Sequence, residues 1–148
     1  MEEDNGRSFN CAESVMIRVN RESPLPGFNS SCMRITSVFG GGIAGYGEVC
    51  GAISGAVVSL GLMLGTNGDE TVDDFKLKRT QARSVVKEFL QEFAECWGSV
   101  QCRHLIAMDE GKRTQVGTLR PEGPPSNLCN EYVDWSTRKI HEIRSSIE

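Results

Sequence analysis

Residues 40–56 read Gly40-Gly41-Gly42-Ile43-Ala44-Gly45-Tyr46-Gly47-Glu48-Val49-Cys50-Gly51-Ala52-Ile53-Ser54-Gly55-Ala56, and the rest of the chain is organised around this stretch. A glycine-rich loop leads into a cysteine, and an apolar segment follows it as far as Leu64. Past Val49, apolar residues recur at the three- and four-residue spacing of a helix. Gly51 and Gly55 lie four residues apart, beside two alanines, so a second helix can approach this face closely. The stretch therefore predicts a buried central helix with a glycine face.

Apolar periodicity, capping residues and glycine stops predict further helices on both sides of the central one. They are expected over about residues 10–19, 30–39, 70–97, 99–106 and 126–143. A loop rich in glycine and proline is expected over residues 109–125, and no stretch alternates as a strand does. The sequence therefore predicts an all-α fold, a single-domain bundle of five or six helices. Residues 1–8 are expected to be a disordered N-terminus, and residues 9–148 a helical, cysteine-containing redox domain.

The composition argues against several classes of function. The chain has 148 residues and a formal net charge of −4, without a basic block that could neutralise nucleic-acid phosphates. The apolar residues 49–65 are short and rich in glycine for a membrane span. The first residues lack the basic start and apolar core of a secretion signal, so we expect a cytoplasmic protein.

Six cysteines in such a chain favour redox or metal chemistry over a framework of structural disulfides. Four of them share a local context, with a serine or glycine three residues upstream and a predicted helix start. These four are Cys11, Cys50, Cys102 and Cys129. The unpaired N–H groups and the dipole at a helix start favour a thiolate, which is the form that attacks disulfides and binds metals. Helix starts can meet at one end of a bundle, so the four cysteines are predicted to share one site.

The remaining candidate groups carry weaker signals. Cys32 and Cys96 lack the helix-start context, and Cys96 is expected to lie outside the shared site. His104 is a candidate proton partner or ligand because it follows Cys102 by two residues, although a surface histidine is the simpler interpretation. The absence of a Cys-x-x-Cys pair disfavours a zinc ribbon or a thioredoxin-type site. The glycine run lacks the lysine of a phosphate-binding loop, so we interpret it as a place where backbones approach closely.

Five motifs, in this order, resemble the C-GCAxxG-C-C family of redox-active proteins. They are Asn10-Cys11-Ala12, Phe39-Gly40-Gly41-Gly42, Cys50-Gly51-Ala52-x-x-Gly55-Ala56, Gly98-Ser99-x-x-Cys102-Arg103 and the late Cys129. The resemblance covers roughly residues 9–135 and implies a small, mainly helical protein with these same four cysteines as its family cysteines. A related domain in a multihaem cytochrome carries an iron–sulfur centre, which keeps a cluster open as a hypothesis. The chain has no Cys-x-x-Cys-His, so covalent haem attachment is not implied.

Three hypotheses follow, and the sequence leaves the choice between them open. The first is a redox-active protein in which Cys11, Cys50, Cys102 and Cys129 perform thiol–disulfide or electron-transfer chemistry, in its catalytic form a thiol-dependent oxidoreductase. The second is an iron–sulfur protein in which the same four cysteines are the metal ligands. The third is a helical interaction module whose cysteines are structural. The redox partner is not identified by the sequence, and self-association is compatible with it.

Overall fold

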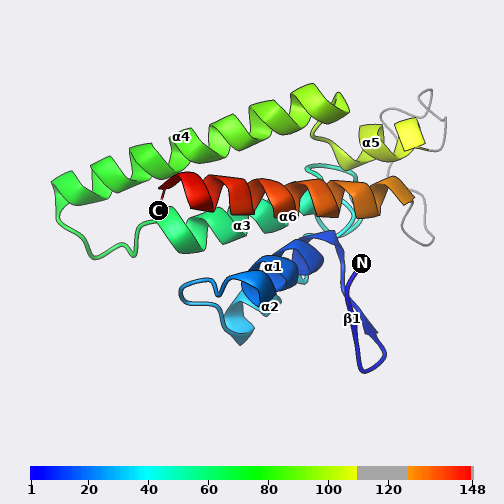
Figure 1. The fold of residues 1–148 in the computed structure, drawn as a ribbon, viewed down its shortest axis with the longest axis horizontal. Coiled ribbons are helices and arrows are strands. Elements are labelled where there is room, and N and C mark those ends of the chain that lie inside the picture. Colours follow the sequence, from blue (N-terminus) through cyan, green and yellow to red (C-terminus); the bar gives the residue numbers. More distant parts are fainter. Residues whose placement is uncertain (110–126, 148) are drawn as a thin grey trace.

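The computed structural model describes residues 1–109 and 127–147, which form six helices and one short hairpin (Figure 1). The helices are α1 (Cys11–Glu22), α2 (Ser30–Thr36), α3 (Gly51–Leu64), α4 (Val72–Trp97), α5 (Cys102–Asp109) and α6 (Asn127–Ile147). The prediction of an all-α bundle is therefore confirmed. The loop expected over residues 109–125 lies outside the described residues, except for Asp109 at the end of α5.

Helix α3 is the central helix, in contact with α1, α2, α4 and α6. Its glycine face packs against α1, where a Cβ on Gly55 would lie 2.3 Å from the carbonyl oxygen of Ala12. A Cβ on Gly51 would lie 2.9 Å from the Cβ of Cys11. Because real Cβ atoms do not approach other atoms so closely, only glycine allows the two helices to lie at this separation. The predicted glycine-faced central helix is confirmed, and α1 is the helix that packs on it.

Local signals set the ends of α1 and α4 as the sequence predicts. Asn10 caps α1 by accepting a hydrogen bond from the N–H of Glu13, and the Glu13 carboxylate accepts one from the N–H of Asn10. Thr71 caps α4 by accepting from the N–H of Asp74. Gly98 ends α4 with a left-handed φ of 85°. These interactions involve only neighbouring residues, which is why the sequence pattern reveals them.

Two helices are more exposed than their apolar patterns predict. Helix α2 ends at Thr36 rather than Phe39, and Ile35 points to solvent instead of the core. In α4 only Phe89 and Phe93 are fully buried, and the N-terminal part of the helix is mostly exposed. Across residues 1–109 and 127–147, no helix combines the length and the apolar character that a bilayer span requires.

The segment 1–8, for which the sequence predicts disorder, contains a hairpin. Strand β1 (Glu3–Asp4) pairs antiparallel with β2 (Arg7–Ser8). Asn5 and Gly6 turn between them with φ values of 48° and 80°, as in a type I′ turn, which the Asn-Gly dipeptide favours. The expectation that no stretch forms a strand is corrected here, and the Asn-Gly pair was the signal that could have shown it.

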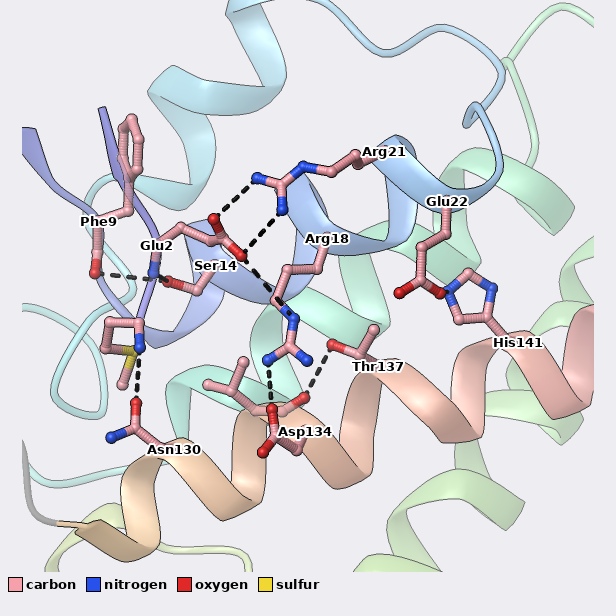
Figure 2. Close-up of polar contacts among 12 residues, drawn as sticks. Glu2, Phe9, Ser14, Arg18, Arg21, Glu22, Asn130, Asp134, Thr137 and His141 are labelled. Atoms are coloured by element: carbon pink, nitrogen blue, oxygen red, sulfur yellow. Dashed lines mark hydrogen bonds and ion pairs between the residues drawn. The ribbon is translucent and has the colours of Figure 1, made fainter. Parts of the chain in front are cut away.

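Glu2 connects the segment before the hairpin to α1, as Figure 2 shows. Its carboxylate lies 2.8 Å from the guanidinium of Arg21 and 3.9 Å from that of Arg18. Arg18 also pairs at 2.5 Å with Asp134 of α6. The hydrogen bond from Arg21 lowers the pKa of the Glu2 carboxyl group. These contacts hold the N-terminal segment, α1 and α6 together on one side of the bundle.

Candidate functional site

The structure brings Cys11, Cys50, Cys102 and Cys129 together around one enclosed void. Three of them lie in the first turns of α1, α5 and α6, and Cys50 is the residue that caps α3. In Figure 1 these helix starts lie at the right-hand end of the bundle. Cys50, Cys102 and Cys129 are 4%, 6% and 5% exposed, whereas Cys11 is only half-buried. The four predicted site residues are thus neighbours in space, and their chemical roles stay predictions.

A pair of backbone hydrogen bonds joins the segment that carries Cys50 to the segment that carries Cys102. The residues immediately before them form an isolated antiparallel β-bridge. The N–H of Cys50 donates to the carbonyl of Val100 at 2.9 Å, and the N–H of Cys102 donates to the carbonyl of Glu48 at 2.6 Å. The guanidinium of Arg103 pairs with the carboxylate of Glu48 and strengthens the same junction. The bridge joins the end of the glycine loop to the start of α5, which the sequence pattern does not predict.

The glycine loop lies directly against the cysteine site. Gly42 has a φ of 74°, and a Cβ on it would lie 2.6 Å from the backbone nitrogen of Glu48 and 2.8 Å from the Cβ of Cys102. Gly41 lines the void itself. The run of glycines therefore lets backbone approach Cys102 closely, as we inferred from the sequence.

The electrostatics of Cys50 differ from the expectation of a thiolate. Burial raises the pKa of its thiol from 9.0 to about 12. The amides of Ala52 and Ile53 lower this pKa, but neither forms a capping hydrogen bond with the sulfur, and desolvation outweighs them. Cys50 is therefore a thiol at neutral pH. The helix start alone was a misleading guide, because it says nothing about how completely the sulfur is removed from water.

The void has apolar walls that the cysteine pattern does not predict, formed by Leu105, Ile106 and Tyr132. The hydroxyl of Tyr132 donates to the carbonyl of Leu105 at 3.3 Å and so joins α6 to α5. Helical spacing could have found these residues, because Leu105 and Ile106 follow Cys102, and Tyr132 follows Cys129, by about one turn.

The other candidate groups lie elsewhere. Cys32 is a buried residue of α2, and its sulfur lies 3.6 Å from the carbonyl oxygen of Gly27. Cys96 is exposed near the end of α4, outside the group around the void. The Nδ1 atom of His104 lies 3.3 Å from the hydroxyl of Ser99, at the turn before α5. The described structure therefore gives His104 a hydroxyl neighbour rather than a place in the lining of the void.

The void is too small for an iron–sulfur cluster in this arrangement. Its volume is about 10 Å³, at most the space of about one water molecule. In the part of the chain that the structure describes, no group of three or more His, Cys, Asp or Glu side chains is arranged to hold a metal ion. A cluster needs its thiolate ligands spread around the metal atoms. The four cysteines as placed here do not fit one.

Ile43 adopts a strained backbone conformation in the glycine loop. Its φ of 67° is left-handed, which a β-branched residue rarely adopts, and its side chain is 44% exposed. We expect Ile43→Gly to raise the free energy of unfolding by about 1 kcal/mol, because the strain relieved exceeds the entropy that glycine loses on folding. Urea denaturation followed by circular dichroism measures the change.

Val38→Gly is the matched control for this prediction. Val38 is also exposed, but its φ is not left-handed, so glycine relieves no strain there. It should lower the free energy of unfolding by about 0.5–1 kcal/mol. Equal destabilisation by both substitutions would show that Ile43 is not strained in solution.

Comparison with known proteins adds a family assignment to this geometry. No curated protein and no solved structure matches the chain. A family model described as "Putative redox-active protein (C_GCAxxG_C_C)" matches residues 9–143, a span that includes all four cysteines around the void. Because the match covers most of the chain, the protein belongs to the C_GCAxxG_C_C family.

Proposed function

We propose that the protein is a thiol–disulfide redox protein whose site consists of Cys11, Cys50, Cys102 and Cys129. The observation that carries the proposal is the convergence of these cysteines, from four separate segments, on one void. Family membership supports a redox function at a coarser level. The other described residues that line the void are glycines, two aliphatic side chains and one tyrosine, so the cysteines supply its thiols.

The chemistry is the exchange of two thiols for one disulfide. Each disulfide that forms releases two electrons and two protons, which pass to the disulfide of an acceptor. A disulfide requires Cα atoms about 4.4–6.8 Å apart, so the proposal needs at least two of the four cysteines around the void to come this close. Burial of three of the sulfurs keeps water and small oxidants away from them, which disfavours oxidation to sulfinic acid. If the site turns over with a substrate, the protein is a thiol-dependent oxidoreductase.

A redox titration with mass spectrometry tests this function. Reduced protein is equilibrated in dithiothreitol buffers for the low end of the range and in glutathione buffers for the high end, under nitrogen, and remaining thiols are alkylated after unfolding. We expect at least one disulfide among the four cysteines, with a potential within roughly −300 to −120 mV, the range of known dithiol proteins. Cys32 and Cys96 should stay reduced. A double variant, Cys32→Ala with Cys96→Ala, should titrate like the unmodified chain.

Two other outcomes would replace the proposal. Folded protein that keeps all four thiols reduced across the titration would favour a structural role for the cysteines. Anaerobic reconstitution that yields stoichiometric iron and sulfide, with a coloured protein, would favour the iron–sulfur hypothesis and would require the four sulfurs to move apart.

A further inference from the structure

Cys11 lies between the enclosed void and an open groove on the surface. The groove has a volume of about 370 Å³ and is lined by Met1, Asn10, Cys11, Ser37, Gly40, Gly41 and Gly45. Cys11 and Gly41 line both the groove and the void. The other three cysteines around the void do not line the groove, and each is at least nine-tenths buried. A molecule in the groove therefore meets one cysteine of the four, Cys11.

The groove is built from backbone and short side chains. A Cβ on Gly40 would lie 2.5 Å from the Cβ of Asn10, so the loop lies directly on the cap of α1. The Asn10 amide donates to the carbonyls of Thr36 and Ser37 at 3.1 and 3.2 Å, which holds the walls in place. No charged side chain lines the groove among the described residues, and the α-ammonium of Met1, which also lines it, donates to the Oδ1 atom of Asn130 at 2.6 Å. Its chemistry thus suits a segment without a positive charge that carries a disulfide.

Cys11 also contacts the buried cysteines. Its Cβ lies against Gly51, the residue immediately after Cys50, so closely that Gly51 has no room for a side chain. Cys11 packs as well on the cluster formed by Cys102, Cys129 and Ile106. Cys11 is thereby the residue of the four that borders both the groove and the buried cysteines.

We propose that Cys11 is the thiol that exchanges with an external disulfide in this groove, and that a buried cysteine resolves the product. The assignment rests on the proposed function. In the first step the Cys11 thiolate attacks one sulfur of the substrate disulfide, forms a mixed disulfide and releases the first substrate thiolate, which takes up a proton. In the second step a buried cysteine loses its proton and attacks the Cys11 sulfur. The second substrate thiol leaves, and the protein holds one internal disulfide.

The electrons balance without a further reactant. The substrate disulfide gains two electrons and two protons and becomes two thiols, while two protein thiols become one disulfide. Cys50 is a poor candidate for the first step because its thiol is buried and protonated at neutral pH. It can take part in the second step once the mixed disulfide has formed beside it.

Hydroxyethyl disulfide, which is small and uncharged, is the first test molecule. Reduced protein is mixed with it under nitrogen, and the products are trapped with acid and mapped by mass spectrometry. We expect the mixed disulfide on Cys11 and a rate of internal oxidation about 100-fold lower in Cys11→Ser, because no other sulfur of the site meets the groove. Cys96→Ser is the matched control, since it removes an exposed cysteine outside the site and should leave the rate unchanged.

Ser37→Phe tests the groove without removing a cysteine. Ser37 is exposed at the end of α2, so the larger side chain should fill the groove and leave the fold intact by circular dichroism. We expect oxidation by the test molecule to slow about 10-fold or more, because the thiol loses access to the substrate. An uncharged peptide disulfide used in parallel distinguishes the substrate source. If the peptide disulfide oxidises the protein faster than hydroxyethyl disulfide does, the substrate is a polypeptide. If it oxidises the protein more slowly, the substrate is a small molecule. In both cases the reaction is expected at Cys11.

The outcomes separate this assignment from the proposed function. If the unmodified chain forms no disulfide among the four cysteines, the proposed function fails. If it does form one, but Cys11→Ser is oxidised at the same rate or the adduct maps to Cys50, Cys102 or Cys129, only the role of Cys11 is overturned. Unchanged oxidation of folded Ser37→Phe would overturn the groove as the place of reaction.

Discussion

Gly55→Ala is expected to lower the free energy of unfolding by about 3 kcal/mol or more, the upper range for an overpacked core. The added Cβ would lie 2.3 Å from the carbonyl oxygen, 2.9 Å from the Cα and 3.0 Å from the carbonyl carbon of Ala12. All three atoms belong to the backbone of α1, so no side chain can rotate away to make room. Helices α1 and α3 would have to separate, and Cys11, next to Ala12, would move away from Gly51.

Gly61→Ala is the matched control in the same helix. A Cβ there has nothing within 4 Å, and the residue is exposed. Alanine is a better helix former than glycine, so this substitution should raise stability by about 0.5–1 kcal/mol. Urea denaturation of both variants gives the two free energies. A Gly55→Ala protein as stable as Gly61→Ala would mean that α1 and α3 do not pack this closely in solution.

The second large effect is a loss of stability at alkaline pH that depends on Cys50. In the unfolded chain its thiol ionises near 9.0, whereas burial raises the pKa in the folded protein to about 12. The contribution of the Cys50 thiol to the free energy of unfolding is therefore fully present below about pH 9. It is lost as the pH rises toward 12, because the unfolded state releases its proton first. The difference between the two pKa values corresponds to as much as about 4 kcal/mol of unfolding free energy.

Urea denaturation at about pH 7, 9 and 11 tests this linkage. Lysines and tyrosines titrate in the same interval, so the useful quantity is the difference between the unmodified chain and Cys50→Ala. At neutral pH the variant should be less stable, because it loses a buried side chain. The difference in the free energy of unfolding between the two proteins should decrease as the pH rises, since alanine has no proton to lose. A constant difference would mean that Cys50 is ionised or accessible to water in the folded protein.

The fold could be read from the sequence wherever neighbouring residues determine it. The capping box of Asn10 and Glu13, the stop at Gly98 and the glycine face of α3 all depend on spacing within one helix. Exposure was harder to predict. Ile35 and the first half of α4 carry apolar residues at helical spacing yet lie at the surface, because no other element packs over them among the described residues.

The candidate site shows the same division. The shared context of four cysteines pointed to their grouping, and helix starts at one end of the bundle do bring them together. The ionisation of Cys50 could not be predicted in this way. A helix start favours a thiolate, but desolvation by the surrounding helices opposes it and is larger. The distinct position of Cys11, between groove and void, likewise depends on the loop that lies over it.

The sequence by itself determined the helices, their caps, the glycine face of α3 and the identity of the four cysteines, because each follows from residue type and spacing along one segment. Only the tertiary structure decided that the glycine face packs on Ala12, that a β-bridge joins the segments of Cys50 and Cys102, and that Cys11 alone of the four lines the groove. Burial and access are properties of surfaces formed by distant segments. Periodicity within one segment therefore cannot reveal them.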